Sequence, residues 1–379
     1  MPYLRALLCL GLTALAACSR TGKQDASSWA LFRGDAGLSG YANIRLSGKP
    51  ALLWSYKSSA RTASSPVVYH QTVYWCDKRG RVYGIDRNGR LCFDYSFHTA
   101  VEATPAICDS VLYIGRIDGF MSALSLAAKD TLWNFETMGQ ISASPNIGTF
   151  EGRQAVVFGS YDNYLYCVDK NSGAEINRFL SGYYINGAVA ILNGCFVSGG
   201  CDAWLRIING TTGAASDSLE LETYIPASPA VSGSYICIAD HAGNVYEIIL
   251  NEGKITRSGK IVQATDRSEA FVSVPALSEA TLFVLSGDRY LYAIDRATGN
   301  IRWKYLQKGA SGESSPVVCC DKVISCSKSG IISLLDADKG TLLWEYDAGE
   351  QITACPAVID GRFYILTVKG SLLCFGENS

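Results

Sequence analysis

Charged side chains are scarce in this chain of 379 residues, at 18% of the total, and they nearly cancel. The 33 Lys and Arg face 35 Asp and Glu, so the formal net charge is −2. Without a basic excess the chain lacks the electrostatic footprint of a nucleic-acid-binding protein, and we expect no nucleic-acid partner. Met, His and Pro are also few, whereas 37 Gly, 21 Tyr and 7 Trp are present. That balance favours short strands and turns over helical bundles.

Motifs of catalysis and metal binding are missing as well. The chain has no Cys-x-x-Cys pair, P-loop, Rossmann fingerprint or nucleophile elbow, and its 3 His do not cluster. The sequence therefore predicts no catalytic, cofactor-binding or metal-binding residue. We expect a protein that is not an enzyme and carries no cofactor.

The N-terminus reads as a targeting signal. An apolar run, Ala6–Ala14, is too short to span a bilayer and is followed by Leu15-Ala16-Ala17-Cys18. This segment resembles the lipobox of bacterial lipoproteins, which predicts a signal peptide at residues 1–17 and lipid attachment at Cys18. An ordinary signal peptide that happens to contain Cys18 is the alternative.

The residues after Cys18 are small and polar, so residues 18–28 are expected to form a lipidated flexible tether. By resemblance to lipoprotein sorting, Ser19 favours the outer membrane over the inner one. No later stretch is long and apolar enough for a membrane-spanning helix. We expect a protein that faces the periplasm and contacts the membrane through its lipid; exposure at the cell surface stays open.

One pattern recurs eight times along the chain: two small residues, a Pro and an apolar run. The copies are centred on Pro66, Pro105, Pro145, Gly187, Pro229, Pro275, Pro316 and Pro356. A spacing of about 40 residues holds four short strands with their turns, which is one propeller blade. The sequence therefore predicts an all-β fold over residues 29–379: a monomeric eight-bladed β-propeller of four-stranded antiparallel blades.

The two ends of the repeat array predict how the ring closes. The segment after Pro356 has room for three strands, so the last blade lacks its fourth. Leu52–Tyr56, which precedes the first repeat, closely matches Leu342–Tyr346 at the fourth-strand position of another copy. We expect this N-terminal strand to complete the last blade, which would leave no open sheet edge at the seam.

A motif near the fourth strand carries a family resemblance. Ala293–Trp303 fits the Ala-x-Asp-x-x-Thr-Gly-x-x-x-Trp docking motif of quinoprotein-like (PQQ-repeat) propellers, and the next copy keeps part of it. The motif positions are Ala293, Asp295, Gly299, Trp303, Asp336, Gly340 and Trp344. The opening Trp29–Asp35 also resembles a lead-in common in these proteins. The WD40 family is set aside, because the chain contains no Trp-Asp dipeptide.

The resemblance implies two branches of function. The longer, enzymatic members bind pyrroloquinoline quinone and calcium above a disulfide between adjacent cysteines; Cys319 and Cys320 are adjacent here but lie inside the repeat. The shorter branch includes BamB-like lipoproteins, and it implies a non-catalytic scaffold that binds protein partners of the envelope, in particular a β-barrel assembly machine. Recognition would use loops on one rim or strand addition to a blade edge. A quinoprotein-type dehydrogenase and a ligand-sensing propeller are the alternatives.

Several residues could be mistaken for functional sites. Twelve Cys remain beside Cys9 and Cys18, and we expect them to be compact core residues, with Cys195 and Cys201, or Cys320 and Cys326, as candidate disulfides. Recurrent Trp and Tyr positions are expected to pack between blades.

Three further features are expected to have no binding role. Glu102 and Glu313 precede a repeat proline, and we expect them to be solvated rim residues. Arg33-Gly34-Asp35 spells the integrin tripeptide but belongs to the lead-in.

Overall fold

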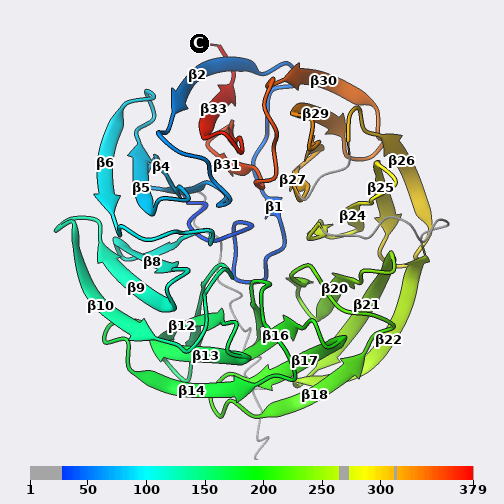
Figure 1. Cartoon of the computed structure of the whole chain (residues 1–379). Helices are drawn as coiled ribbons and strands as arrows, with labels where there is room; N and C mark the ends of the chain where they lie inside the picture. The colour runs from blue at the N-terminus through cyan, green and yellow to red at the C-terminus, as the bar shows by residue number, and fades with distance from the viewer. Residues whose placement is uncertain (1–27, 264–272, 311–313, 379) are drawn as a thin grey trace, which may run out of the picture.

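The chain folds into a ring of eight blades around one axis (Figure 1). The computed structural model describes residues 28–263, 273–310 and 314–378, and none of these residues is helical. In these ranges there is accordingly no helix that could cross a bilayer. Each blade is a four-stranded antiparallel sheet whose strands follow the chain from the axis outward. The predicted all-β eight-bladed propeller is confirmed.

The strands fall into blades in chain order. Blades 1 and 2 contain β3 (Val67–Tyr69), β4 (Thr72–Cys76), β5 (Arg81–Ile85), β6 (Leu91–Ser96), β7 (Ala106–Cys108), β8 (Val111–Gly115), β9 (Phe120–Ser125) and β10 (Asp130–Glu136). Blades 3 and 4 contain β11 (Asn146–Phe150), β12 (Arg153–Gly159), β13 (Tyr164–Asp169), β14 (Glu175–Leu180), β15 (Ala190–Leu192), β16 (Cys195–Gly199), β17 (Trp204–Asn209) and β18 (Ala215–Glu220).

Blades 5 and 6 contain β19 (Ala230–Ser232), β20 (Tyr235–Ala239), β21 (Asn244–Asn251), β22 (Lys254–Gln263), β23 (Ala276–Leu277), β24 (Thr281–Leu285), β25 (Tyr290–Asp295) and β26 (Ile301–Leu306). Blade 7 contains β27 (Val317–Cys319), β28 (Lys322–Cys326), β29 (Ile331–Asp336) and β30 (Leu342–Asp347). Blade 8 contains β31 (Ala357–Ile359), β32 (Arg362–Leu366), β33 (Ser371–Gly376) and, from the N-terminal part of the chain, β2 (Ala51–Lys57).

The sequence pattern of each strand matches its depth in the blade. Second strands such as β24 are buried at every position, because both faces of the sheet are covered by neighbouring blades. Outer strands such as β26 alternate between exposed and half-buried residues, since only one face packs inward. The continuous apolar runs and the alternating aromatic pairs thus mark the inner and outer parts of one sheet.

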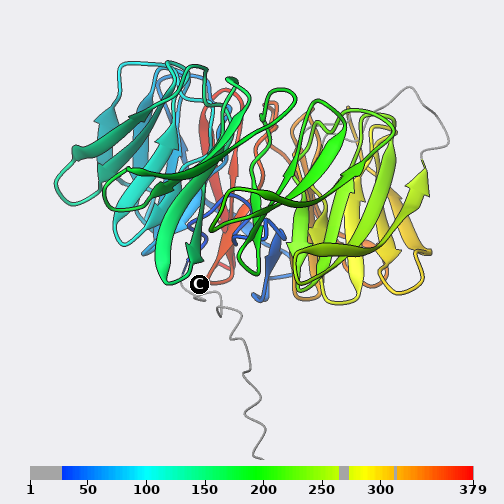
Figure 2. The same cartoon turned by 90° about the horizontal axis from the view of Figure 1, so that it is seen from below.

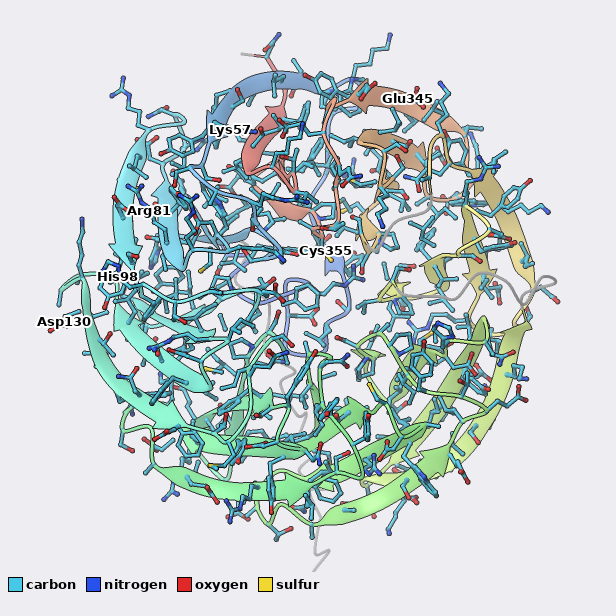
Figure 3. All side chains as sticks on the ribbon, viewed as in Figure 1. Lys57, Arg81, His98, Asp130, Glu345 and Cys355 are labelled. Atoms are coloured by element: carbon cyan, nitrogen blue, oxygen red, sulfur yellow. The ribbon has the colours of Figure 1, made fainter. Side chains whose placement is uncertain are left out.

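A Ser or Thr residue directly before a repeat Pro links neighbouring blades at five junctions. Its hydroxyl group accepts a hydrogen bond from the backbone N–H at the same position of the blade before it, as in Ser65 N to Thr104 Oγ1 (2.8 Å) and Thr104 N to Ser144 Oγ (3.1 Å). The bond from Cys355 N to Ser65 Oγ (2.9 Å) carries this pattern across from blade 8 to blade 1. The recurring Ser and Thr residues are therefore a circumferential link near the axis, where Figure 3 labels Cys355.

The N-terminal belt, residues 29–42, is a feature that the sequence did not predict. This segment crosses the centre of the ring (Figure 1) and accepts backbone hydrogen bonds from the first strands of blades 2, 4, 5, 6 and 7. The donors and acceptors are Ile107 N to Ala30 O, Ile191 N to Ala36 O, Val231 N to Gly37 O, Leu277 N to Ser39 O and Val318 N to Gly40 O, at 2.7–2.9 Å. Its end forms β1 (Tyr41–Ala42), which pairs parallel with β27, so blade 7 has five strands instead of the expected four.

Arg33 fixes the belt to the ring from inside. The side chain is 1% exposed, and its guanidinium donates to the carbonyl oxygens of Pro275 (2.6 Å) and Pro316 (2.5 Å) in the approaches to blades 6 and 7. A buried guanidinium must find such acceptors, because an unsatisfied buried charge is costly. The Arg of the Arg33-Gly34-Asp35 tripeptide is therefore inaccessible, in agreement with the expectation that it has no binding role.

The seam closes as the sequence predicts. Strand β2 pairs antiparallel with β33, from Ala51 opposite Gly376 to Lys57 opposite Ser371. Glu350 reinforces the pairing, since it accepts hydrogen bonds from Lys57 Nζ (2.8 Å), Thr367 Oγ1 (2.6 Å) and Ser371 Oγ (2.8 Å). Burial alone would raise the pKa of Glu350, but these three donors outweigh it and lower the pKa to about 2.

Replacing Arg33 with Gln should lower the free energy of unfolding by about 3 kcal/mol, because two buried carbonyl groups lose their donor. Thermal and urea unfolding followed by circular dichroism would measure the loss. Arg79→Gln is the matched control, since Arg79 is exposed on a turn and its side chain has no hydrogen-bonding partner among the described residues. Equal stability of the two variants would contradict the proposed role of Arg33.

Glu350→Gln should cost about 1 kcal/mol at neutral pH, because the ion pair between half-exposed Lys57 and Glu350, which is 21% exposed, is lost at the seam. The carboxylate has a lower pKa in the folded state than the usual 4.5, so its stabilisation is complete above about pH 4.5 and fades as the pH falls toward 2. Urea titrations across this pH range should show the two proteins converging. Glu136→Gln, at an exposed carboxylate without a partner in the described chain, should show no such convergence.

Candidate functional site

The propeller has two chemically different faces (Figure 2). The hairpin face carries the turns that join the first strand of a blade to the second and the third to the fourth. The loop face carries the turns between second and third strands, together with the loops that lead to the next blade. We expect binding residues on these two faces, because the strands between them pack against neighbouring blades.

A cluster of exposed aromatic side chains lies on the loop face over blades 2 to 5. We call it the aromatic rim, and its members are Met138, Tyr161, Tyr183, Tyr184, Tyr224 and His241. Met138 is 93% exposed, and Tyr183, Tyr184 and Tyr224 are 38–49% exposed. This cluster could not be predicted from the repeats, because its residues lie in loops whose sequences do not align from one repeat to the next.

Ring stacking holds the aromatic rim in place. The rings of Tyr161 and Tyr184 are nearly parallel with centroids 5.0 Å apart, and Tyr183 lies 4.4 Å from Tyr184. Tyr224 stacks on His241 at 4.2 Å. Because Tyr161–Tyr184 and Tyr224–His241 each join two different loops, these exposed rings are ordered before any partner binds.

The backbone beneath the rim is fixed by acidic residues of the following blade. Asp162 accepts a hydrogen bond from Met138 N (3.0 Å), and Asp202 accepts one from Gly182 N (3.1 Å). Asp202 also pairs with Arg206. Burial would raise the pKa of Asp202, but the guanidinium of Arg206 outweighs burial and lowers it. The Asp202 carboxylate therefore stays ionised, and both Asp residues anchor the loops that carry the rim.

Such a surface suits protein binding. Tyr and Met are enriched at protein interfaces, and stacked rings bury large area on binding at a low cost in side-chain entropy. The rim offers no nucleophile paired with a base.

The residues of the predicted docking motif lie where neighbouring blades meet. Trp303 of blade 6 donates from Nε1 to the carbonyl of Ala337 in blade 7 (3.0 Å), and its ring covers Gly340. Trp344 of blade 7 packs against Phe375 of blade 8, with ring centroids 5.3 Å apart. Ala293 is buried opposite Phe283 within blade 6.

The acidic positions of the motif cap turns. Asp295 accepts hydrogen bonds from Thr298 N (2.9 Å) and from Arg302 (3.0 Å), and these donors lower the pKa of Asp295 to about 2. Asp336 accepts the backbone N–H groups of the next turn in the same way. Gly299 and Gly340 have φ of 72° and 67°, which Gly adopts without strain.

All twelve described cysteines are free, and eight of them are buried. The expected role as core residues is confirmed for those eight, whereas the two candidate disulfides are wrong. Cys195 and Cys326 each lie at one end of a strand and their candidate partners lie beyond the other end. At about 3.3 Å per residue along a strand, these pairs are too far apart for a disulfide.

The residues that a quinone site would need do not fit one here. Cys319 is buried in β27, and the Cys320 thiol lies at the following turn, where it contacts Asn43 Oδ1 at 3.4 Å. The pair is not a disulfide. Across the described ranges, no three His, Cys, Asp or Glu residues are grouped to hold a metal ion.

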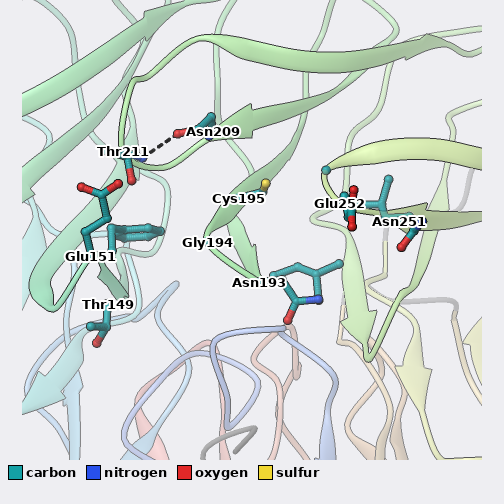
Figure 4. A pocket seen from close by; sticks show the side chains of 13 residues that line it. Thr149, Glu151, Asn193, Gly194, Cys195, Asn209, Thr211, Asn251 and Glu252 are labelled. Atoms are coloured by element: carbon teal, nitrogen blue, oxygen red, sulfur yellow. Dashed lines mark hydrogen bonds between the residues drawn. The ribbon is translucent and has the colours of Figure 1, made fainter. Parts of the chain in front are cut away.

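A cavity of about 550 Å³ lies on the hairpin face over blade 4 (Figure 4). It exists because the hairpins β11–β12 and β21–β22 are longer than β15–β16 between them. Glu151, Glu252 and the Cys195 thiol line it. Burial raises the pKa of Cys195, so the thiol stays protonated and is a poor nucleophile.

The remaining predicted residues fall into two groups. Glu102 forms a surface ion pair with Lys78 at 2.7 Å, as a solvated rim residue would. Glu313, the signal peptide, the tether and Cys18 lie outside the described residues.

The fold and the interblade contacts define a class: this is an eight-bladed propeller of PQQ-like repeats. A family profile described as outer membrane protein assembly factor BamB matches residues 44–179 and 201–379. The chain therefore belongs to the BamB family of PQQ-like repeat propellers.

Individual relatives are distant in sequence. BamB of Legionella pneumophila is 25% identical over 170 residues, which are 45% of this chain and 41% of that protein. BamB of Shewanella oneidensis is 21% identical over 283 residues, 69% of this chain and 67% of that protein. A tetrathionate hydrolase of Acidithiobacillus ferrooxidans is 24% identical over 265 residues, 65% of this chain and 48% of that enzyme. Alignments to the Legionella protein and the hydrolase thus span less than half of those relatives.

Solved structures share the fold. BamB from Moraxella catarrhalis superposes with a TM-score of 0.72 at 18% identity, over 87% of this chain and 98% of that one. A europium-containing methanol dehydrogenase reaches 0.77 at 12% identity, over 93% and 99%. At such identities the likeness describes architecture alone.

Gly340→Ala should destabilise the protein by about 3 kcal/mol. A Cβ at Gly340 would lie 2.5 Å from the ring of Trp303, and the positive φ adds about 1 kcal/mol. Gly349→Ala is the matched control, because Gly349 has the same φ of 66° and no atom within 4 Å of that position. Urea unfolding should therefore show a clearly smaller loss for Gly349→Ala; equal losses would mean that the Trp–Gly contact contributes nothing.

Proposed function

We propose that this protein is a lipid-anchored, non-catalytic scaffold that binds protein partners at the aromatic rim and serves outer-membrane protein assembly. The observation that carries the proposal is the rim itself: two stacks of exposed rings, Tyr161–Tyr184–Tyr183 and Tyr224–His241, on loops of neighbouring blades. Family membership supports the assembly role, since related proteins are named outer membrane protein assembly factors.

The anchor and location are part of the same proposal. Cys18 carries the lipid after removal of residues 1–17, and the propeller works as a monomer on the periplasmic side of the outer membrane. The lipobox-like residues Leu15–Cys18 support this assignment.

A dehydrogenase or hydrolase activity has less support. The enzymes of similar fold match at low identity, and the described residues do not form the cysteine and calcium sites that a quinone needs. The centre of the ring, on the axis, is instead crossed by the belt and Arg33.

The double variant Tyr183→Ala/Tyr184→Ala should abolish the assembly function while leaving the ring intact. Two stacked, exposed aromatic rings at the centre of an interface contribute about 2 kcal/mol each to binding, or roughly 30-fold each in affinity. The measurement is the level of outer-membrane β-barrel proteins, by quantitative mass spectrometry, in a deletion strain that expresses each variant. It should fall to the level of the deletion strain.

The matched control is Leu132→Ala/Leu306→Ala, which removes two comparably exposed apolar side chains from outer strands. It should restore wild-type levels. Full restoration by the tyrosine variant would argue against the rim as the docking surface, and unchanged levels on deletion would remove the assembly role altogether.

A further inference from the structure

The hairpin face carries a groove of about 600 Å³ where blade 8 meets blade 1. Arg87 and Arg362 line it, together with Trp54, Asp360 and Glu377. The carbonyl of Arg87 accepts hydrogen bonds from Trp54 Nε1 (2.9 Å) and Arg362 Nη1 (2.8 Å), which hold the two blades in register here. The groove is thus built into the seam itself.

Two arginines, Arg87 and Arg362, stand among the residues that line this groove, and Arg90 ends the same β5–β6 turn. The seam patch, as we call it, contains these three cations together with Asp86, Asp360 and Glu377. Among the described residues, none forms a salt bridge with any of the three cations. Asp86 is engaged by the backbone N–H groups of Asn88 and Arg90. Guanidinium groups without an acidic partner beside a concave surface are suited to an oxyanion.

Exposed aliphatic side chains flank the same patch. Leu52, at the start of β2, is 40% exposed, and Leu91, at the start of β6, is 42% exposed. Both strands begin at the hairpin face. Basic groups beside exposed Leu residues are the combination that the boundary between lipid headgroups and acyl chains accommodates.

The chain enters the ring from the hairpin face, at the inner strand of blade 1. Ser28 Oγ donates to the carbonyl of Val68 in β3 of blade 1, and Trp29 pairs with the same residue. Ten residues separate Ser28 from Cys18. Even fully extended they reach about 35 Å, so a lipid on Cys18 keeps this end of the hairpin face near the bilayer. This step rests on the lipid anchor of the proposed function.

We propose that the seam patch binds the phosphate headgroups of anionic phospholipids. Arg87 and Arg362 contact the phosphate, and Leu52 and Leu91 lie at the acyl boundary. This contact sets the hairpin face against the bilayer and turns the aromatic rim, on the opposite face, away from it toward partners.

Vesicle sedimentation tests the proposal without the anchor. A chain of residues 19–379 contains every described residue, so the whole ring with its belt is retained. It should bind vesicles that contain phosphatidylglycerol, bind phosphatidylcholine vesicles far less, and lose binding as salt rises. Each cation near an anionic surface contributes about 1 kcal/mol, or roughly fivefold, so Arg87→Gln should weaken binding about fivefold and Arg87→Gln/Arg362→Gln about 25-fold.

The control is Arg79→Gln/Lys328→Gln, which removes two exposed cations from the loop face and should change nothing. Arg362→Gln loses its bond to the Arg87 carbonyl, so thermal unfolding must accompany the double variant; Arg87→Gln loses no side-chain hydrogen bond and decides the matter if the double variant unfolds. Equal binding to both kinds of vesicle, no binding, or equal losses in the control would overturn the proposal. Tyr183→Ala/Tyr184→Ala should keep full vesicle binding, so failure at the rim and failure at the seam patch are separable.

Discussion

Closure of the ring is the constraint on which the rest of this structure depends. Each blade buries its faces against two neighbours, so a gap at any position would expose apolar surface on both sides. Three devices close it: strand β2 in blade 8, the hydroxyl bonds that run from Cys355 to Ser65 and onward, and the N-terminal belt held by Arg33. All three join the beginning of the chain to its end.

Because the ring is closed, its two faces can carry surfaces of different chemistry. Because packing is satisfied between blades, the loops and hairpins at the strand ends are not needed to bury the core. The loop face can then expose stacked tyrosines around Tyr184, and the hairpin face can leave Arg87 and Arg362 without acidic partners. A recognition surface and an electrostatic surface coexist on one ring because most of the contacts that close it lie between the strands and near the axis.

Much of the fold could be predicted from the sequence, because a repeat amplifies weak signals. One Ser-Pro step says little, but eight copies fix the blade count, and the match of Leu52–Tyr56 to Leu342–Tyr346 fixes the seam. The belt could not be predicted, since Trp29–Ala42 pairs through backbone atoms with strands far along the chain and has no period of its own. The aromatic rim was missed for a related reason: Tyr183 and Tyr224 sit in loops whose sequences differ from blade to blade. The two candidate disulfides were wrong because a strand is extended. Residues such as Cys320 and Cys326, which lie near each other in the sequence but on either side of one strand, are therefore far apart in space.

The pairing of N-terminal residues with C-terminal residues also affects how the protein folds. Ser65 meets Cys355 and Lys57 meets Glu350 across nearly 300 residues, so few of the closing contacts are local. Loop-closure entropy must be overcome before these contacts stabilise anything, which makes such a topology slow to fold. During synthesis the belt is made first, and its partners follow along almost the whole chain, from Val68 in blade 1 to Val318 in blade 7. Until blade 8 has formed, the apolar face of blade 1 that packs against it stays exposed, and such a surface favours aggregation.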